Sequence, residues 1–127
     1  TAASQEGDQS YLGRTGASDP HFNLRRDPAL ILARKQAATT VFAQLIEVHG
    51  AYHPAAEIPV NAYSQIKRLK VLHAAAEYSL LAFETISGTS YRFVLANQDA
   101  DLATEHVLQH GGQSYRWVGP YLFEKEE

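Results

Sequence analysis

The stretch TSYRFVLAN, residues 89–97, decides the fold class of this chain. Its large apolar side chains, Tyr91, Phe93 and Leu95, occupy every second position, with polar or smaller residues between them. Successive side chains of an extended strand point to opposite faces, so period-two ordering is typical of a half-buried β-strand. The stretch therefore predicts a strand with one face toward a core.

Two glycine-containing connections extend this strand into antiparallel pairs. Ser87 and Gly88 join YSLLAFETI to TSYRFVLAN, and Gly111 with Gly112 joins EHVLQH to QSYRWVG. Glycine adopts the positive φ angles that tight hairpins need. Several short strands separated by glycine turns favour an all-β fold, an antiparallel β-sandwich, in which the 13 aromatic side chains would fill the layer between two sheets.

Two other segments fit a helix as well as a strand. DPALILARKQAA begins with a capping residue, Asp27, and has Pro28 at the first helical position. SQIKRLKVLHAAAEYSLLAFETI places Ile66, Leu69 and Leu72 near one helical stripe. In contrast, TTVFAQLIEV is rich in β-branched residues, which favour strands. Periodicity alone leaves both interpretations open.

The length of 127 residues suits one folded domain. Residues 1–26 are rich in Gly, Ser and Asp and predict an irregular tether or surface loop, whereas residues 27–127 predict the β-sandwich domain. The chain starts at Thr1 and contains no methionine, so we expect a mature product or a fragment of a larger multidomain protein.

Composition excludes several kinds of function. The chain contains no cysteine, which rules out disulfides, a thiolate nucleophile and cysteine-ligated zinc. The net charge of −3 gives no basic excess, so we expect no nucleic acid partner. No run of about 18 apolar residues exists, so we expect no membrane partner. No glycine-rich phosphate motif and no nucleophile elbow are present, so we predict no cofactor, and nothing in the sequence marks a catalytic triad.

The stretch EVHGAYHPAAE, residues 47–57, carries the first group of candidate site residues: His49, Tyr52 and Glu57. His49 and His53 have the spacing of a helical zinc pair, but the neighbouring glycine and proline disfavour a helix, so we predict no metal site. Glu47 and Glu57 could form a glycosidase carboxylate pair, although any two acids flanking a loop could meet that condition. A polar loop with solvated histidines is the simplest interpretation.

Two further groups of polar residues are candidates for a site. ASDPHFNLRRDP contains Asn23 and Arg25, and a guanidinium binds a carboxylate in a bidentate manner. The alternative for that segment is a charged turn leading into a strand. His106 and His110 lie about 13 Å apart if they occupy one strand. That distance is too long for one metal ion, so both are interpreted as edge or surface positions of a hairpin.

The segments GASDPHFNLRRDPALILARK, TVFAQLIEVHGAYHPAAE and IKRLKVL, in this order, resemble the C-terminal β-domain of oligoalginate lyases, polysaccharide lyase family seventeen, in the heparinase II/III-like group. The resemblance covers residues 16–72 best. It implies an all-β sandwich, which decides against the helical alternatives. It also implies a periplasmic or secreted parent enzyme that cleaves mannuronate and guluronate oligomers exolytically by β-elimination.

In such enzymes the resemblance places catalysis in an upstream toroid and a central β-domain, which would be the partners of this chain together with an alginate oligosaccharide. The resemblance thus implies that this chain carries no catalytic residues. It leaves two groups of residues as substrate contacts or interdomain contacts: first His49, Tyr52 and Glu57, and second Asn23 and Arg25. The alternatives are an adaptor β-sandwich or a stand-alone carbohydrate-binding module, whose aromatic platform would consist of Trp117, Tyr115 and Tyr121.

Overall fold

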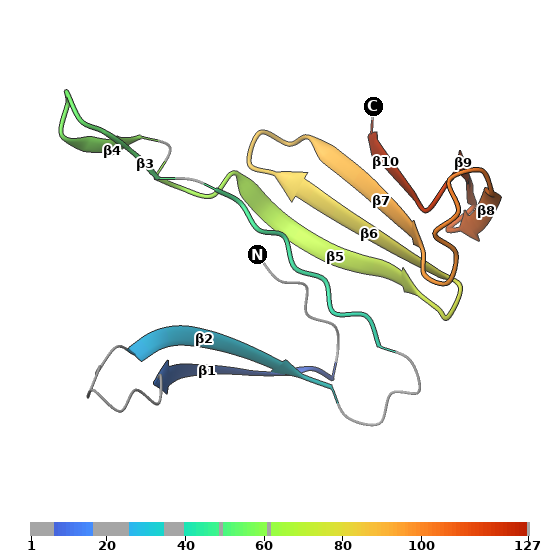
Figure 1. The fold of residues 1–127 in the computed structure, drawn as a ribbon, viewed down its shortest axis with the longest axis horizontal. Helices are drawn as coiled ribbons and strands as arrows, with labels where there is room; N and C mark the ends of the chain where they lie inside the picture. Colours follow the sequence, from blue (N-terminus) through green and yellow to red (C-terminus); the bar gives the residue numbers. More distant parts are fainter. Residues whose placement is uncertain (1–6, 17–25, 35–39, 49, 61, 127) are drawn as a thin grey trace. The chain divides into compact units, whose positions relative to one another are not determined.

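The structure, a computed structural model, describes residues 7–16, 26–34, 40–48, 50–60 and 62–126. All regular elements within these ranges are β-strands: β1 (Gln9–Gly16), β2 (Arg26–Ala33), β3 (Ala51–His53), β4 (Ile58–Val60), β5 (Ile66–Ala74), β6 (Tyr78–Thr85), β7 (Ser90–Ala96), β8 (Glu105–His110), β9 (Gln113–Val118) and β10 (Tyr121–Lys125). Every pairing is antiparallel, which confirms the predicted all-β antiparallel fold (Figure 1).

The chain divides into two compact units, residues 4–38 and residues 39–127 together with residues 1–3. The smaller unit contains the β1–β2 hairpin, in which Gln9 pairs with Ala33. A bidentate ion pair from Arg34 to Asp8, with N–O distances of 2.6 and 2.7 Å, closes its open end. The predicted irregular chain over residues 1–26 is therefore wrong where β1 lies. The period-two pattern there is weak because Gly13 and polar residues interrupt it, and the pairing with β2 supplies the ladder that makes it a strand. The division into a tether and a sandwich domain stays a prediction.

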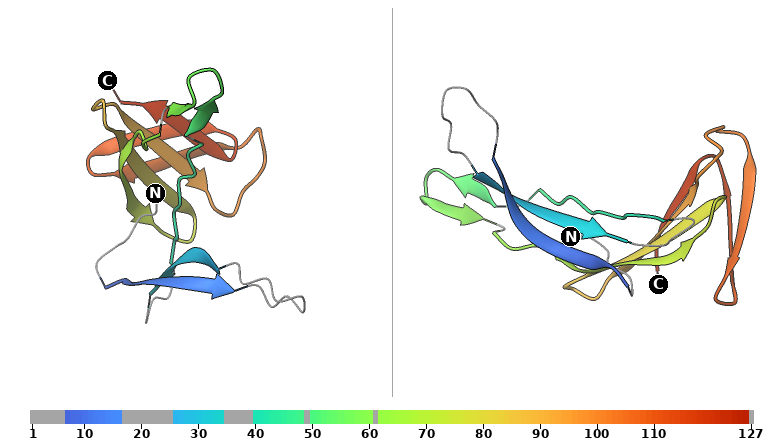
Figure 2. Two further views of the ribbon diagram at one scale, coloured as in Figure 1. Left: turned by 90° about the vertical axis from the view of Figure 1, so that its left-hand side faces the viewer. Right: turned by 90° about the horizontal axis from the view of Figure 1, so that it is seen from below.

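The larger unit contains a four-stranded sheet in the order β10–β7–β6–β5. The β8–β9 ribbon is inserted in the sequence between β7 and β10 and packs on one face of this sheet as a second, smaller layer (Figure 2). The ribbon turns at Gly111 and Gly112, whose φ angles are 58° and 83°, and the β6–β7 hairpin turns at Gly88, φ 86°. Both predicted hairpins are confirmed.

The core lies between the ribbon and the sheet. Leu80 and Val94 are completely buried, and the ribbon covers them with side chains that alternate along its two strands. The buried members of this cluster are Leu80, Val94, Ala96, Leu108, Tyr115 and Trp117. Burial of Tyr115 and Trp117 contradicts the predicted exposed aromatic platform, because the period-two pattern of β9 points both rings at the sheet.

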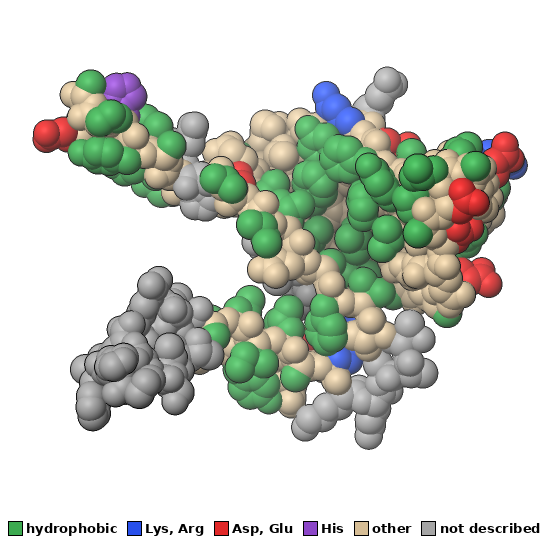
Figure 3. All heavy atoms as spheres, in the orientation of Figure 1, with side chains coloured by type: hydrophobic (Ala, Val, Ile, Leu, Met, Phe, Trp, Pro, Cys, Tyr) green, Lys and Arg blue, Asp and Glu red, His purple; other side chains and the backbone are tan. Residues whose placement is uncertain are grey.

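The opposite face of the sheet carries a row of aromatic side chains, which we call the aromatic face. Its rings stack across neighbouring strands, with centroids 4.8 Å apart for Phe83 and Tyr91 and 5.6 Å apart for Tyr91 and Phe123. Phe123 and Tyr121 remain 54% and 57% exposed. Figure 3 shows hydrophobic side chains gathered over the sheet on this face. The aromatic residues therefore divide between two faces and do not fill one common layer.

Residues 40–48 cover part of the aromatic face beside β5. Ala43 is buried against Leu69, and Leu45, Val71, Leu81 and Phe83 pack around this pair. The β-branched composition of this segment favoured a strand, but the segment runs as extended chain with a single bridge at Gln44. The apolar side chains of this segment pack on the sheet, and no neighbouring strand forms a continuous row of backbone hydrogen bonds with it in the described residues, so it is not a regular strand. Residues 27–33 of DPALILARK lie in β2, and residues 64–86 contain β5 and β6, so neither of the two segments that fitted a helix forms one in the described residues.

Candidate functional site

The predicted polar loop at residues 47–57 is a short β-hairpin, which we call the arm. Ala51–His53 pairs with Ile58–Val60, and all six of these residues are exposed. The turn is closed by the Glu57 N–H, which donates to the His53 carbonyl at 2.9 Å, and by the Ala56 N–H, which donates to His53 Nδ1 at 3.1 Å. Glu57 has a φ of 55°, a conformation that costs energy for a side chain other than glycine. His53 therefore has a role in the turn.

The base of the arm is closed by Glu47. Its carboxylate accepts hydrogen bonds from the Ser64 hydroxyl at 2.6 Å and from the Gln65 N–H at 2.7 Å. The Gln65 carbonyl in turn accepts the Ile86 N–H at 2.8 Å, which joins the end of the arm to the β6–β7 connection. Glu47 thus holds two chain segments together at the point where the arm leaves the sheet.

The structure describes two of the five predicted site residues. Tyr52 lies on β3 opposite Pro59 and is 63% exposed, and Glu57 lies exposed in the turn. His49, Asn23 and Arg25 lie outside the described residues. The described pair shares the arm, and Tyr52 presents its ring to solvent there.

His106 corrects the interpretation of the second histidine pair. Its side chain is 6% exposed, so it is not an edge or surface position, whereas His110 is half-buried. The His106 ring packs against Trp117 at a centroid distance of 5.2 Å, and its Nδ1 lies 3.5 Å from the Tyr78 hydroxyl. Its Nε2 lies 3.9 Å from an Asp99 carboxylate oxygen and makes no hydrogen bond. His106 has the same parity as Leu108 in EHVLQH, which is the sequence signal that predicts its inward position.

Asp99 borders a hollow of about 310 Å³ at this end of the sheet, together with Tyr78 and His106. The backbone N–H of Asp101 donates to Asp99 at 2.8 Å and is the main cause that lowers the pKa of this carboxyl. The cluster lacks the arrangement of a metal centre, since no three His, Asp or Glu side chains of the described ranges group in a metal-binding manner.

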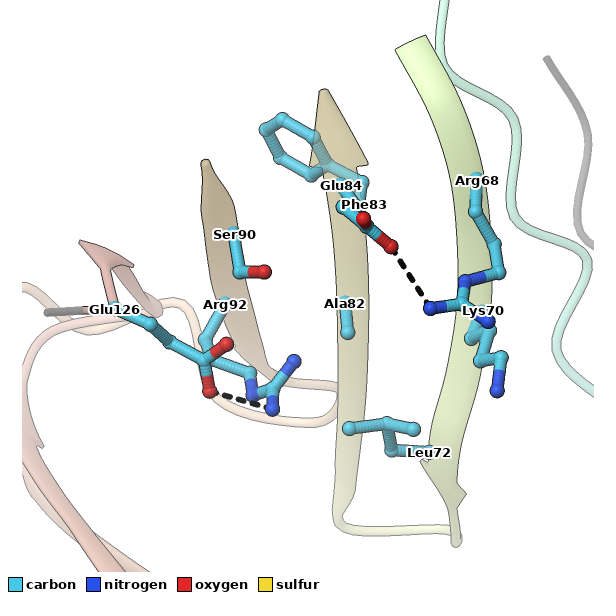
Figure 4. Close-up of a pocket in the computed structure, with 9 residues that line it drawn as sticks. All are labelled: Arg68, Lys70, Leu72, Ala82, Phe83, Glu84, Ser90, Arg92 and Glu126. Atoms are coloured by element: carbon cyan, nitrogen blue, oxygen red, sulfur yellow. Dashed lines mark hydrogen bonds and ion pairs between the residues drawn. The ribbon is translucent and has the colours of Figure 1, made fainter. Parts of the chain in front are cut away.

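A polar groove of about 220 Å³ lies on the same sheet face as the β8–β9 ribbon (Figure 4). Two cross-strand rows form its floor. In one row Arg68 of β5 pairs with Glu84 of β6, which pairs with Ser90 of β7. The groove is lined by Arg68, Lys70, Leu72, Ala82, Phe83, Glu84, Ser90, Arg92 and Glu126.

In the second row Lys70 of β5 pairs with Ala82, and Ala82 pairs with Arg92 of β7. Neighbouring strands lie about 4.8 Å apart, so the Lys70 and Arg92 backbones are separated by about 10 Å with only a methyl group between them. The groove exists because this central position carries alanine, whose side chain leaves the space above the strand open. Sequence reasoning missed the groove, because the groove depends on which residues of three strands lie opposite one another.

Two glutamates partly neutralise the groove. Glu84 accepts hydrogen bonds from Lys67 at 2.6 Å and Arg68 at 2.8 Å. The bond from Lys67 lowers the pKa of the Glu84 carboxyl most, and desolvation opposes this shift. Glu126 pairs with Arg92. Cationic groups separated by a methyl group and flanked by acceptors suit an anionic ligand that also carries hydroxyl groups.

The described residues define an all-β domain with a polar groove on one face of its sheet and an exposed aromatic face on the other. No family model matches the chain. The chain is similar to an alginate lyase of Stenotrophomonas maltophilia, with 32% identity over 113 residues, which cover 89% of this chain and 15% of that protein.

It is also similar to an exo-oligoalginate lyase of Saccharophagus degradans, with 27% identity over 108 residues, or 85% of this chain and 14% of that protein. The resemblance to oligoalginate lyases that the sequence motifs indicated is therefore confirmed. The chain spans about one seventh of the length of these relatives. None of the described residues form a helix long and apolar enough to cross a bilayer.

Proposed function

We propose that this chain is the C-terminal, non-catalytic β-domain of an exo-acting oligoalginate lyase of polysaccharide lyase family seventeen, in the heparinase II/III-like group. One observation carries the proposal: similarity to two alginate lyases extends over 85–89% of the chain but over only 14–15% of each relative. A segment of this size serves a larger enzyme as one of several domains. The parent enzyme is periplasmic or secreted in this proposal.

The aromatic face supports a role as a domain in a larger protein. Phe123, Tyr121 and Leu95 lie on one face of the sheet and are each at least 36% exposed. Contiguous apolar surface of this kind is unfavourable in water and is typical of an interface. The upstream toroid and the central β-domain of the parent enzyme are the partners that we propose for it.

The chemistry of β-elimination supports a non-catalytic role. The reaction needs a group that neutralises the uronate carboxylate, a base that removes the C5 proton and an acid that assists the leaving oxygen. The cluster of tyrosine, histidine and carboxylate around His106 borders a hollow of about 310 Å³, but the His106 side chain is only 6% exposed and its ring packs against Trp117 as part of the core contacts. We therefore place the reacting groups in the upstream domains.

The arm is the proposed substrate-lining element. An isolated two-stranded ribbon is marginally stable in water, so a fully exposed ribbon gains stability when it contacts a neighbouring surface. In the parent enzyme the arm would bring Tyr52, Glu57 and His49 to the edge of the substrate cleft, where they hydrogen-bond sugar hydroxyls. Asn23 and Arg25 would contact a uronate carboxylate or the domain boundary.

Two measurements test the proposal. The isolated chain, incubated with oligoalginate, should produce no ultraviolet absorbance from unsaturated uronate, whereas the complete parent enzyme should produce it. Turnover by the isolated chain would refute the non-catalytic assignment.

The second measurement compares Phe123→Glu in the isolated chain and in the parent. Because Phe123 is 54% exposed, the change should shift the melting temperature of the isolated chain little and that of the parent strongly. Val118→Glu, a similarly exposed position on β9, is the control and should have little effect in either protein. Equal shifts for Phe123→Glu in both proteins would contradict an interface at the aromatic face.

A further inference from the structure

In the cross-strand row Lys70–Ala82–Arg92, an alanine lies between two cations, at a position where a carboxylate could pair with them. In the neighbouring row Glu84 lies beside Arg68 and neutralises it. At the equivalent place in the next row Ala82 lies beside Lys70, and no carboxylate of the described residues pairs with that ammonium group. In Figure 4 no dashed line joins Lys70 to another of the residues drawn, whereas Arg68 is joined to Glu84 and Arg92 to Glu126.

The charges around the groove are unbalanced. Three cations, Arg68, Lys70 and Arg92, and two anions, Glu84 and Glu126, line the groove, which leaves an excess of one positive charge on a chain whose net charge is −3. In addition, Arg92 Nε is buried and donates no hydrogen bond. A buried donor without an acceptor is costly, and an external acceptor in the groove would remove that cost.

We propose that this groove binds the carboxylate of one uronate unit, with Lys70 and Arg92 on either side of the anion above Ala82. The inference rests on the proposed function only for the identity of the ligand, a uronate oligomer. The volume of about 220 Å³ is below the range of about 300–1,000 Å³ for drug-sized sites. It therefore suits one sugar unit of an oligomer and leaves the rest of that oligomer outside.

The acceptors in the groove distinguish a uronate from other anions. Ser90, Glu84 and Glu126 line the groove beside the cations, and carboxylates accept hydrogen bonds from sugar hydroxyls. An acidic peptide brings carboxylates without hydroxyl groups, so it offers Glu84 and Glu126 fewer hydrogen-bond donors to offset the repulsion between carboxylates. A ligand that combines one carboxylate with several hydroxyls satisfies both kinds of group.

The test is a titration of the isotope-labelled 127-residue chain with an oligomer of mannuronate and guluronate, monitored by backbone amide chemical shifts. Shifts should concentrate on the groove strands β5, β6 and β7. Lys70→Gln should weaken binding about fivefold at low ionic strength, as expected for the loss of one ionic contact of about 1 kcal/mol. Higher salt should weaken wild-type binding, because these charges are solvent-accessible.

Arg116→Gln is the matched control, since it removes one exposed positive charge that does not line the groove, and it should change the affinity less than twofold. Ala82→Asp places a carboxylate between Lys70 and Arg92 and should abolish binding while the chain remains folded. A neutral cello-oligosaccharide and triglutamate, used as comparison ligands, should bind at least tenfold more weakly.

Three outcomes would overturn the proposal: unchanged affinity in Lys70→Gln, shifts that avoid the groove, or equal binding of triglutamate, which would indicate a site for acidic protein segments. None of these outcomes affects the domain assignment, which depends on turnover and on Phe123→Glu in the parent enzyme. Conversely, if the isolated chain proves catalytic, the groove assignment is still decided by the Lys70→Gln titration.

Discussion

Trp117→Ala should distinguish a core role for this ring from a role as a sugar platform. The ring is 7% exposed and lies edge-on to Tyr78, with centroids 5.5 Å apart, between the β8–β9 ribbon and the sheet. A buried tryptophan removes about 150–250 Å² from water, which corresponds to about 4–6 kcal/mol at about 25 cal/mol per Å². Measured losses for such truncations are about 3–5 kcal/mol, a large part of the roughly 5–15 kcal/mol that stabilise a domain.

The assay is urea unfolding followed by far-ultraviolet circular dichroism. With a slope of about 1–1.5 kcal/mol per molar urea, Trp117→Ala should lower the midpoint by roughly 2 M or more. Tyr121→Ala, at 57% exposure, should cost less than about 1 kcal/mol in the same assay. Trp117 is also the single tryptophan of the chain, so its native fluorescence should be blue-shifted and should move to the red on unfolding. An unchanged midpoint together with exposed-type emission would refute the core assignment.

Three further perturbations follow from the local geometry. Gly112→Ala should lower the free energy of unfolding by about 1 kcal/mol, because Gly112 has a φ of 83° and open space around it, which leaves backbone strain as the only cost. Gly13→Ala, also in open space but without a positive φ, is the control and should lower it clearly less in the same assay. Glu84→Gln should make the free energy of unfolding depend less on pH in acid. The pKa of Glu84 is lowered in the folded state, so the stability that its carboxylate contributes is present above the unfolded pKa and is lost as the pH falls through the folded pKa. An acid transition in the variant like that of the wild type would contradict this. Glu47→Ala removes the acceptor of the Gln65 amide and should therefore speed hydrogen exchange at that amide, while the Val94 amide in the sheet stays protected. Equal exchange at Gln65 in variant and wild type would show that Glu47 does not hold the base of the arm.

Local pattern predicted the central sheet and its hairpins. Alternation in residues 89–97 requires one inward face, and Gly88 and Gly112 supply the backbone conformations that their turns need. In the same way the parity of His106 with Leu108 could have predicted its burial. Residue type alone predicts the opposite, because histidine is intermediate between buried and exposed residues and is rarely buried without a partner.

Long-range register determines the parts that pattern did not predict. β5 carries irregularities between Ile66 and Arg68 and between Val71 and His73, and each one shifts which side chains share a face. The helical interpretation of residues 64–86 has the same origin, since a bulged strand loses strict period two. The opposition of Lys70 and Arg92 across Ala82 therefore requires the three-strand register, which single-strand periodicity does not contain.

The two faces of one sheet divide the proposed roles of this chain. On one face the β8–β9 ribbon covers Leu80 and Val94 with Trp117 and leaves the far end open, where charged side chains replace apolar ones and form the groove. On the other face residues 40–48 cover only the region around Leu69, and aromatic rings continue uncovered to Phe123. Burial of those rings gains free energy only when another surface supplies the second layer, whereas the groove offers an anion the exposed Lys70 ammonium and the buried Arg92 Nε donor. A single sheet can thus attach the domain by its apolar face and bind a charged sugar by its polar face.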